Sequence, residues 1–101
     1  MMLYPSCRRN TVVPPAAAPA NFARSASGTD IVFTWDAVAN AATYRLQNSL
    51  NGTSGWASLA SGIVGLTYTL VDGTIDPPAY YRVRAENAGG NGPWSSSIQY
   101  P

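Results

Sequence analysis

The sequence predicts an all-β domain, a seven-stranded antiparallel β-sandwich, on three observations. Short segments of alternating apolar and polar residues, rich in β-branched and aromatic side chains, recur at spacings of about 8–12 residues. Turn-forming Gly, Pro and Asn residues separate them, and no window shows a helical repeat of useful length. In the strongest segment, residues 30–36, Ile31, Phe33 and Trp35 share one side. We expect two sheets to close over Trp35, because burial of so large an aromatic dominates a small core.

The seven expected strands span residues 21–27, 31–36, 43–48, 54–60, 66–70, 80–87 and 94–100. The first follows Pro19 and turns Phe22 inward, and a turn cluster at 27–30 leads into the second. The third alternates, with Tyr44 and Leu46 facing the core. Asn51-Gly52 is a strong hairpin signal and introduces the fourth strand, which carries Trp56.

The last three strands follow the same pattern. The fifth alternates Leu66, Tyr68 and Leu70 with threonines, and a connection with two adjacent prolines follows it. The sixth alternates Tyr81, Val83 and Ala85 with charged residues. A Gly-rich loop at 88–93 precedes the final strand, in which Ile98 points inward.

Length, charge and cysteine content argue against several classes of protein. The chain of 101 residues is long enough for one domain with a modest core. Its net charge of +1 offers no bulk attraction to nucleic acid or to an anionic membrane. A single cysteine, Cys7, excludes an internal disulfide, and nothing resembles a membrane span of about 20 apolar residues or a signal peptide.

Histidine, which is frequent in catalytic and metal sites, is absent from the sequence. Without histidine there is no Ser-His or Cys-His pair and no imidazole ligand. Asp72 and Asp76 lie close in sequence but lack the dense alternating oxygens of a calcium loop. Cys7 has no visible activating base, so we interpret it as a bystander thiol. We therefore expect no enzyme, no metal and no cofactor.

Four motifs, in this order and spacing, resemble a fibronectin type III domain over residues 19–101. They are Trp-Asp-Ala-Val at 35–38, Ala-Thr-Tyr-Arg-Leu at 42–46, Tyr-Arg-Val-Arg-Ala-Glu-Asn at 81–87, and Gly-Asn-Gly-Pro-Trp-Ser at 90–95. The resemblance implies an immunoglobulin-like sandwich with Trp35 in its core. It also implies a scaffold for adhesion, spacing or assembly rather than for a reaction.

One position departs from that family. Its corner tyrosine should fall at Ala79, and the preceding turn is about two residues short. The sequence leaves open whether Tyr80 or Tyr81 takes over the hydroxyl-to-backbone bond or whether the bond is missing.

Residues 1–18 are expected to form an extended Pro/Ala-rich arm before the sandwich of residues 19–101. Such a segment cannot bury enough surface by itself to offset an ordering entropy of about 1–2 kcal/mol per residue. It becomes ordered against the domain's own flank, a second copy, or another protein, and we favour another protein. The expected contact residues are Leu3, Tyr4, Arg8 and Arg9.

Two further sets of residues are candidates for binding. Arg45, Arg82 and Arg84 should point outward from neighbouring strands, either as a docking face for carboxylates or as an ordinary solvated sheet face. Trp56 and Trp94 lie next to turns, where they either pack on the sandwich edge, contact a protein or stack on a sugar.

These observations lead to two hypotheses of different classes. Because the chain begins with Met and shows no export signal, we expect a complete small gene product. The first hypothesis is a bacteriophage virion subunit, a capsid decoration or tail-associated protein, whose arm docks on a major capsid or tail protein or on its own copies. The alternative is an accessory spacer or weak carbohydrate-binding module of a secreted bacterial polysaccharide-degrading enzyme. An animal-type adhesion domain is a weaker third, since Arg-Gly-Asp is absent.

Overall fold

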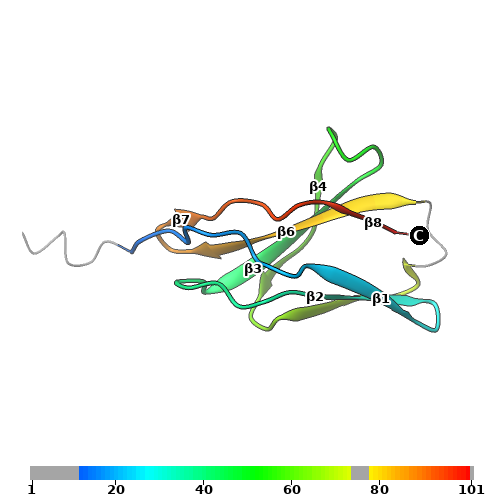
Figure 1. Ribbon diagram of the computed structural model, residues 1–101, viewed down its shortest axis with the longest axis horizontal. Coiled ribbons are helices and arrows are strands. Elements are labelled where there is room, and N and C mark those ends of the chain that lie inside the picture. The colour runs from blue at the N-terminus through cyan, green and yellow to red at the C-terminus, as the bar shows by residue number, and fades with distance from the viewer. Residues whose placement is uncertain (1–11, 74–77, 101) are drawn as a thin grey trace, which may run out of the picture.

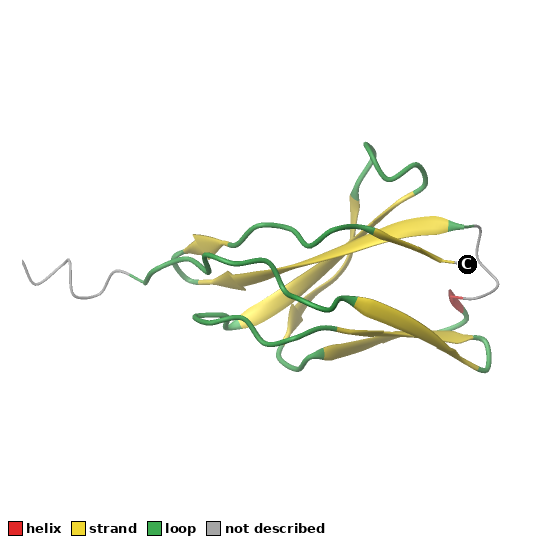
Figure 2. Cartoon of the chain, in the orientation of Figure 1, coloured by secondary structure: helices red, strands yellow, loops and turns green. Residues whose placement is uncertain are grey.

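The computed structural model describes residues 12–73 and 78–100, which form two antiparallel sheets packed face to face (Figures 1 and 2). One sheet has the strand order β1-β2-β5, and the other has the order β4-β3-β6-β7, with β8 also paired to β6. The strands are β1 (Ala23–Ser27), β2 (Asp30–Thr34), β3 (Thr43–Ser49), β4 (Ala57–Ile63), β5 (Thr67–Leu70), β6 (Ala79–Asn87), β7 (Gly90–Asn91) and β8 (Ile98–Tyr100). The predicted antiparallel β-sandwich is confirmed.

The final predicted strand is interrupted in the structure. Only Ile98–Tyr100 pair as β8, and the predicted Gly-rich loop contains the short β7. Pro93, which has no N–H to give to a ladder, follows β7 and limits how far that short strand can extend. Isolated bonds still hold the intervening segment beside β6, because Gly92 donates to the Ala85 carbonyl at 2.8 Å and Ser95 to the Val83 carbonyl at 2.8 Å.

The fourth strand begins at Ala57, later than the prediction of residue 54. The β3–β4 turn is longer because polar side chains bond its backbone. The Asn51 carboxamide oxygen accepts the Thr53 and Ser54 N–H groups, both at 2.9 Å. The Ser49 hydroxyl accepts the Gly52 N–H at 3.1 Å. These bonds satisfy the turn without a sheet partner, so pairing starts only after Trp56.

The core lies between the two sheets, and Trp35 is 4% exposed within it, as expected. Its ring centroid lies 5.5 Å from that of Tyr44, which comes from the opposite sheet. Phe33 and Tyr81 pack across the same interface with centroids 4.7 Å apart. Each such side chain contributes about 1.5–3 kcal/mol by burial, so these cross-sheet pairs hold the layers together.

The corner position of the resembled family is filled by Ala79, whose small side chain is buried in the core. A different tyrosine makes a hydroxyl-to-backbone bond in this chain. The Tyr44 hydroxyl accepts the Val38 N–H at 3.0 Å, and so ties the loop after Trp35 to β3. Tyr81 is buried, with an exposed fraction of 1%.

The described part of the leading segment lies on the sandwich itself. Pro15 and Pro19 are buried, and the Val13 carbonyl accepts a 2.7 Å bond from the Asn87 carboxamide. A Cβ added at Gly89 would lie 1.8 Å from the Val12 carbonyl oxygen, so only glycine permits this approach. The chain from residue 12 therefore runs along the β6–β7 turn, at the end of the sandwich opposite to the end of β8 (Figure 1).

Several predicted positions fall outside the described residues. They are the arm contacts Leu3, Tyr4, Arg8 and Arg9, together with Cys7 and Asp76. In the part of the chain that the structure describes, no helix is long and apolar enough to cross a membrane.

Candidate functional site

The outer face of the larger sheet brings together the five predicted surface residues. Strand alternation turns Leu46 and Val83 into the core and their polar neighbours outward. The antiparallel register then places Arg45 opposite Arg84. We call this surface the arginine–tryptophan face; it consists of Arg45, Gln47, Trp56, Ser58, Arg82, Arg84, Glu86 and Trp94.

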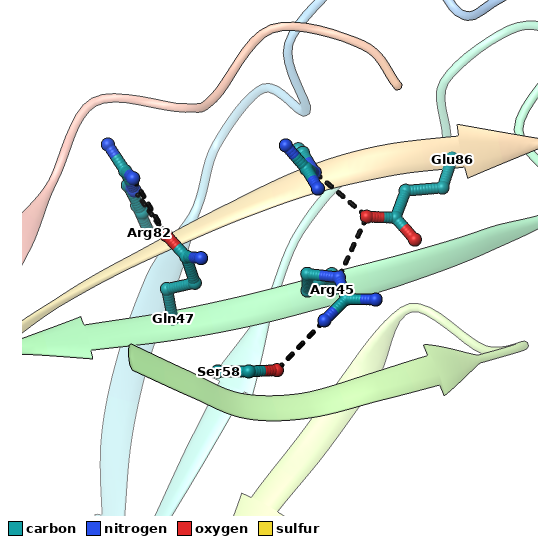
Figure 3. Close-up of polar contacts among 6 residues, drawn as sticks. Arg45, Gln47, Ser58, Arg82 and Glu86 are labelled. Carbon is teal, nitrogen blue, oxygen red and sulfur yellow. Dashed lines mark hydrogen bonds and ion pairs between the residues drawn. The ribbon is translucent and has the colours of Figure 1, made fainter. Parts of the chain in front are cut away.

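In one half of this face, Glu86 links the side chains of Arg45 and Arg84 (Figure 3). One of its carboxylate oxygens accepts Nε–H bonds from Arg45 at 2.9 Å and from Arg84 at 2.8 Å. Like charges directly opposite on paired strands repel, and this shared carboxylate offsets the repulsion. Arg45 also donates through Nη1 to the Ser58 hydroxyl at 3.0 Å, which extends the network to β4.

The pKa of Glu86 reflects these contacts. Burial alone raises the pKa, but the hydrogen bonds and charges of Arg84 and Arg45 outweigh it, so the pKa lies below its ordinary value. The side chain is 15% exposed, and those of Arg45 and Arg84 are 31% and 21% exposed. Glu86 is therefore ionised at neutral pH and holds both arginines in fixed positions.

The other half of the face is a stack of guanidinium groups and indole rings. The Cζ atom of Arg82 lies 4.1 Å from the ring centroid of Trp56 and 4.3 Å from that of Trp94. Arg84 lies over the same Trp94 ring at 4.4 Å. A cation–π contact contributes about 0.5–2 kcal/mol, more as the cation is desolvated. The two tryptophans thus pack against arginines of their own chain.

Arg82 has a neutral partner instead of an acid. Its Nε and Nη2 atoms donate to the Gln47 carboxamide oxygen at 3.0 Å and 2.7 Å (Figure 3). Burial, followed by the nearby charge of Arg84, lowers the pKa of Arg82 from its ordinary value. The guanidinium stays charged at neutral pH, since its ordinary pKa is so high.

Charge is divided unevenly over the described residues. Three arginines against one glutamate leave the arginine–tryptophan face with a formal excess of positive charge. The remaining charged side chains are one arginine and three aspartates: Arg24, Asp30, Asp36 and Asp72. Positive charge is therefore concentrated on this face, although the net charge of the whole chain is only +1.

The rest of the described surface offers little chemistry. No group of three or more His, Cys, Asp or Glu side chains lies together within residues 12–73 and 78–100. Asp72 accepts a bond from the Thr29 hydroxyl at 2.8 Å and donates its own N–H to Asp30 at 2.9 Å. A groove of about 340 Å³ beside Phe22 and Ile98 has no ionisable side chain in its lining.

Two important residues were not identified from the sequence. Strand alternation predicts that Gln47 faces outward, but nothing in its spacing indicates that it bonds Arg82. Asn87 anchors three segments through one side chain: it donates to the carbonyls of Val13 and Asn40 at 2.7 Å and 2.8 Å, and accepts the Gly89 N–H at 2.8 Å. Its position just before a Gly-Gly turn is a local signal for the last of these bonds only.

The fold has close counterparts among solved structures. An FN3tt mutant superposes with a TM-score of 0.71 at 18% identity, over 86% of this chain and 94% of that one. An Fn3-like protein from Clostridium thermocellum gives 0.61 at 26% identity, over 84% and 96%. A β-1,2-glucanase from Parabacteroides distasonis gives 0.68 at 23% identity, over 91% of this chain and 14% of that one.

No protein-family model matches the sequence, and a search of curated proteins found no match. The assignment therefore depends on three-dimensional likeness together with the motifs around Trp35, Tyr44 and Tyr81. The strand order, the cross-sheet core and the solved relatives agree with one another. The chain therefore has the fold of a fibronectin type III domain.

Proposed function

We propose that this chain is a non-enzymatic binding domain that serves as a small subunit of a bacteriophage virion, either a capsid decoration or a tail-associated protein. The likeness to other Fn3-like structures supports the coarse part of this proposal, a β-sandwich for binding or spacing. The finer part is supported by how the leading segment is fixed. Residues 12–19 lie along one end of the sandwich, while β8 ends at the other (Figure 1).

This geometry suits attachment through the N-terminal side. Asn87 and the buried Pro15 fix the direction in which the chain enters the domain. A partner that binds the residues before position 12 would hold the sandwich with its β8 end pointing away. Extended segments gain affinity from main-chain bonds and from a few side-chain anchors. We assign the anchors to Leu3 and Tyr4, with Arg8 and Arg9 pairing to acidic groups of a major capsid or tail protein.

The experiment that tests this function removes residues 1–11 and leaves residues 12–101 intact. We expect the shortened chain to keep its thermal midpoint, because the described contacts of the sandwich begin at residue 12. It should also be lost from particles purified from the source lysate. The double variant Leu3→Ala, Tyr4→Ala is the milder form of the same test. Incorporation of the shortened chain at the full level would contradict the proposal.

One observation favours the alternative, a spacer in a secreted polysaccharide-degrading enzyme. The glucanase resembles this domain over only 14% of its own length, so such a sandwich also occurs inside a longer glucanase chain. Residue 12 and the end of β8 lie at opposite ends of the sandwich, which suits a spacer as well (Figure 1). Sugar binding receives less support, since guanidinium groups lie over both candidate rings. A shift of tryptophan fluorescence on titration with β-1,2-glucan would favour the carbohydrate function over the virion function.

A further inference from the structure

Arg82 is the cation of the arginine–tryptophan face that lacks an acidic partner. The described carboxylate of this face belongs to Glu86, and its bonding oxygen is shared by Arg45 and Arg84. Arg82 donates instead to the neutral carboxamide of Gln47. Within residues 12–73 and 78–100, no carboxylate forms an ion pair with Arg82. A positive charge is therefore held in place without compensation.

The unused donors of Arg82 and Arg84 lie on the same side of one strand. Nη1 of Arg82 and both Nη atoms of Arg84 have no hydrogen-bond acceptor among the described residues. The two arginines are two positions apart on β6, so their side chains leave the same face. Stacking on Trp94 and the bonds to Gln47 and Glu86 fix both guanidinium planes before any partner arrives.

We propose that the arginine–tryptophan face docks an acidic peptide segment of another protein, whose Asp or Glu carboxylates pair with the unused N–H groups of Arg82 and Arg84. Planar guanidinium groups match a carboxylate through paired N–H bonds, which are short and charge-assisted. The bound anion also relieves the repulsion between the two neighbouring cations. This inference depends on the proposed binding function and names the chemistry of one partner surface.

The observations favour an acidic protein over other anions. The excess positive charge of the face is small, which suits one or two carboxylates better than the dense phosphates of nucleic acid. Guanidinium groups lie over Trp56 and Trp94, which disfavours stacking of an acidic sugar on those rings. The face is the open side of a sheet, which can accept an extended peptide lying across β3 and β6.

The test titrates the full-length chain with hexaglutamate at low ionic strength and follows the arginine Nε–Hε resonances. We expect those of Arg82 and Arg84 to shift together and saturably, while hexaglutamine leaves them unchanged. The variant Arg82→Gln should weaken hexaglutamate binding about tenfold, the loss expected for one charge-assisted contact. Arg82→Lys, which keeps the charge but loses the planar fork, should fall in between.

Arg24→Gln is the matched control, since it removes the same charge from the opposite sheet and should change the affinity less than about twofold. Equal weakening by Arg24→Gln and Arg82→Gln would overturn the inference, because binding would then follow net charge alone. Tighter binding of polygalacturonate than of hexaglutamate would overturn it in favour of an acidic polysaccharide. Thermal unfolding of each variant verifies folding, and Arg82→Lys replaces Arg82→Gln should the latter unfold.

The arm experiment separates the two proposals. A chain that enters particles but leaves the Arg82 and Arg84 resonances unmoved by hexaglutamate contradicts this inference alone. A chain that binds hexaglutamate but enters particles without residues 1–11 contradicts the virion attachment alone.

Discussion

The two sheets of this sandwich share one core but differ on their outer faces. On the smaller sheet, the paired outward positions of β2 and β5 carry small neutral residues such as Val32, Thr34 and Thr69. On the larger sheet, the equivalent positions carry arginines, a glutamate and flanking tryptophans. The smaller sheet shows that this core needs no charged outer face. This difference is the basis on which we propose a binding role for the arginine–tryptophan face.

The largest effect is expected from a substitution in the core that the two sheets share. Trp35→Ala deletes the central side chain of the interface and should lower the free energy of unfolding by about 3–5 kcal/mol. Because Trp35 packs on Tyr44 of the other sheet, both faces should lose structure in one transition. Chemical denaturation followed by fluorescence and by circular dichroism measures this. Thr69→Ala, on the solvent side of β5, is the control. Separate transitions for the two sheets would contradict a common core.

A smaller effect comes from the contact of the leading segment with the β6–β7 turn. Gly89→Ala should cost about 1–3 kcal/mol, because its Cβ would lie 1.8 Å from the Val12 carbonyl oxygen and push that segment away. Gly65→Ala meets no atom within 4 Å and is the matched control. In a chain that lacks residues 1–18 the cost of Gly89→Ala should fall to that of the remaining 3.3 Å approach to the Asn87 side chain, and a double-mutant cycle by thermal unfolding gives the coupling. An unchanged cost in the shortened chain would show that residues 12–18 do not hold this position.

Glu86→Gln tests the larger sheet alone. Loss of the shared carboxylate leaves Arg45 opposite Arg84 and should cost about 1–2 kcal/mol at pH 7, moderated by partial exposure. Since the pKa of Glu86 is lowered in the folded state, its contribution is complete above its unfolded pKa and is lost as pH falls through its folded pKa. The stabilities of the two chains should therefore converge on acidification below about pH 4. Asp36→Asn is the control, because Glu86 still titrates in that variant. A stability difference between the original chain and Glu86→Gln that does not change with pH would contradict the role assigned to Glu86.

The smallest expected effect concerns the one described arginine outside the arginine–tryptophan face. Arg24 extends from β1 over the Tyr100 ring at 4.7 Å and donates to the Gln99 carbonyl at 3.2 Å. It is exposed, so Arg24→Ala should cost about 0.5 kcal/mol or less. A loss as large as that of Glu86→Gln in the same thermal scans would show that the two sheets do not differ as described.

Local patterns were sufficient to predict the sandwich and the composition of its larger face. Alternation placed Trp35 and Tyr44 in the core and Arg82 and Arg84 outside it, because a strand has only two sides. The start of the fourth strand was wrong because Ser49 and Asn51 extend the turn by side-chain bonds that no periodicity records.

Long-range pairings could not be predicted from the sequence. The stacking of Arg82 on both Trp56 and Trp94 joins positions separated by 26 and 12 residues. The position of Pro15 against Gly92 depends on a turn far along the chain. Such contacts follow from strand order and register, which emerge only when both sheets assemble.

The arginine Nε–Hε spectrum of the Trp94→Phe and Trp94→Ala variants tests most directly whether the arginine–tryptophan face is one prearranged unit. Trp94→Ala should shift the Hε resonances of Arg82 and Arg84 together and leave that of Arg24 in place, whereas Trp94→Phe should have a smaller effect on the same pair. Unmoved Arg82 and Arg84 resonances in a folded Trp94→Ala variant would contradict the stacked arrangement on which the docking face depends.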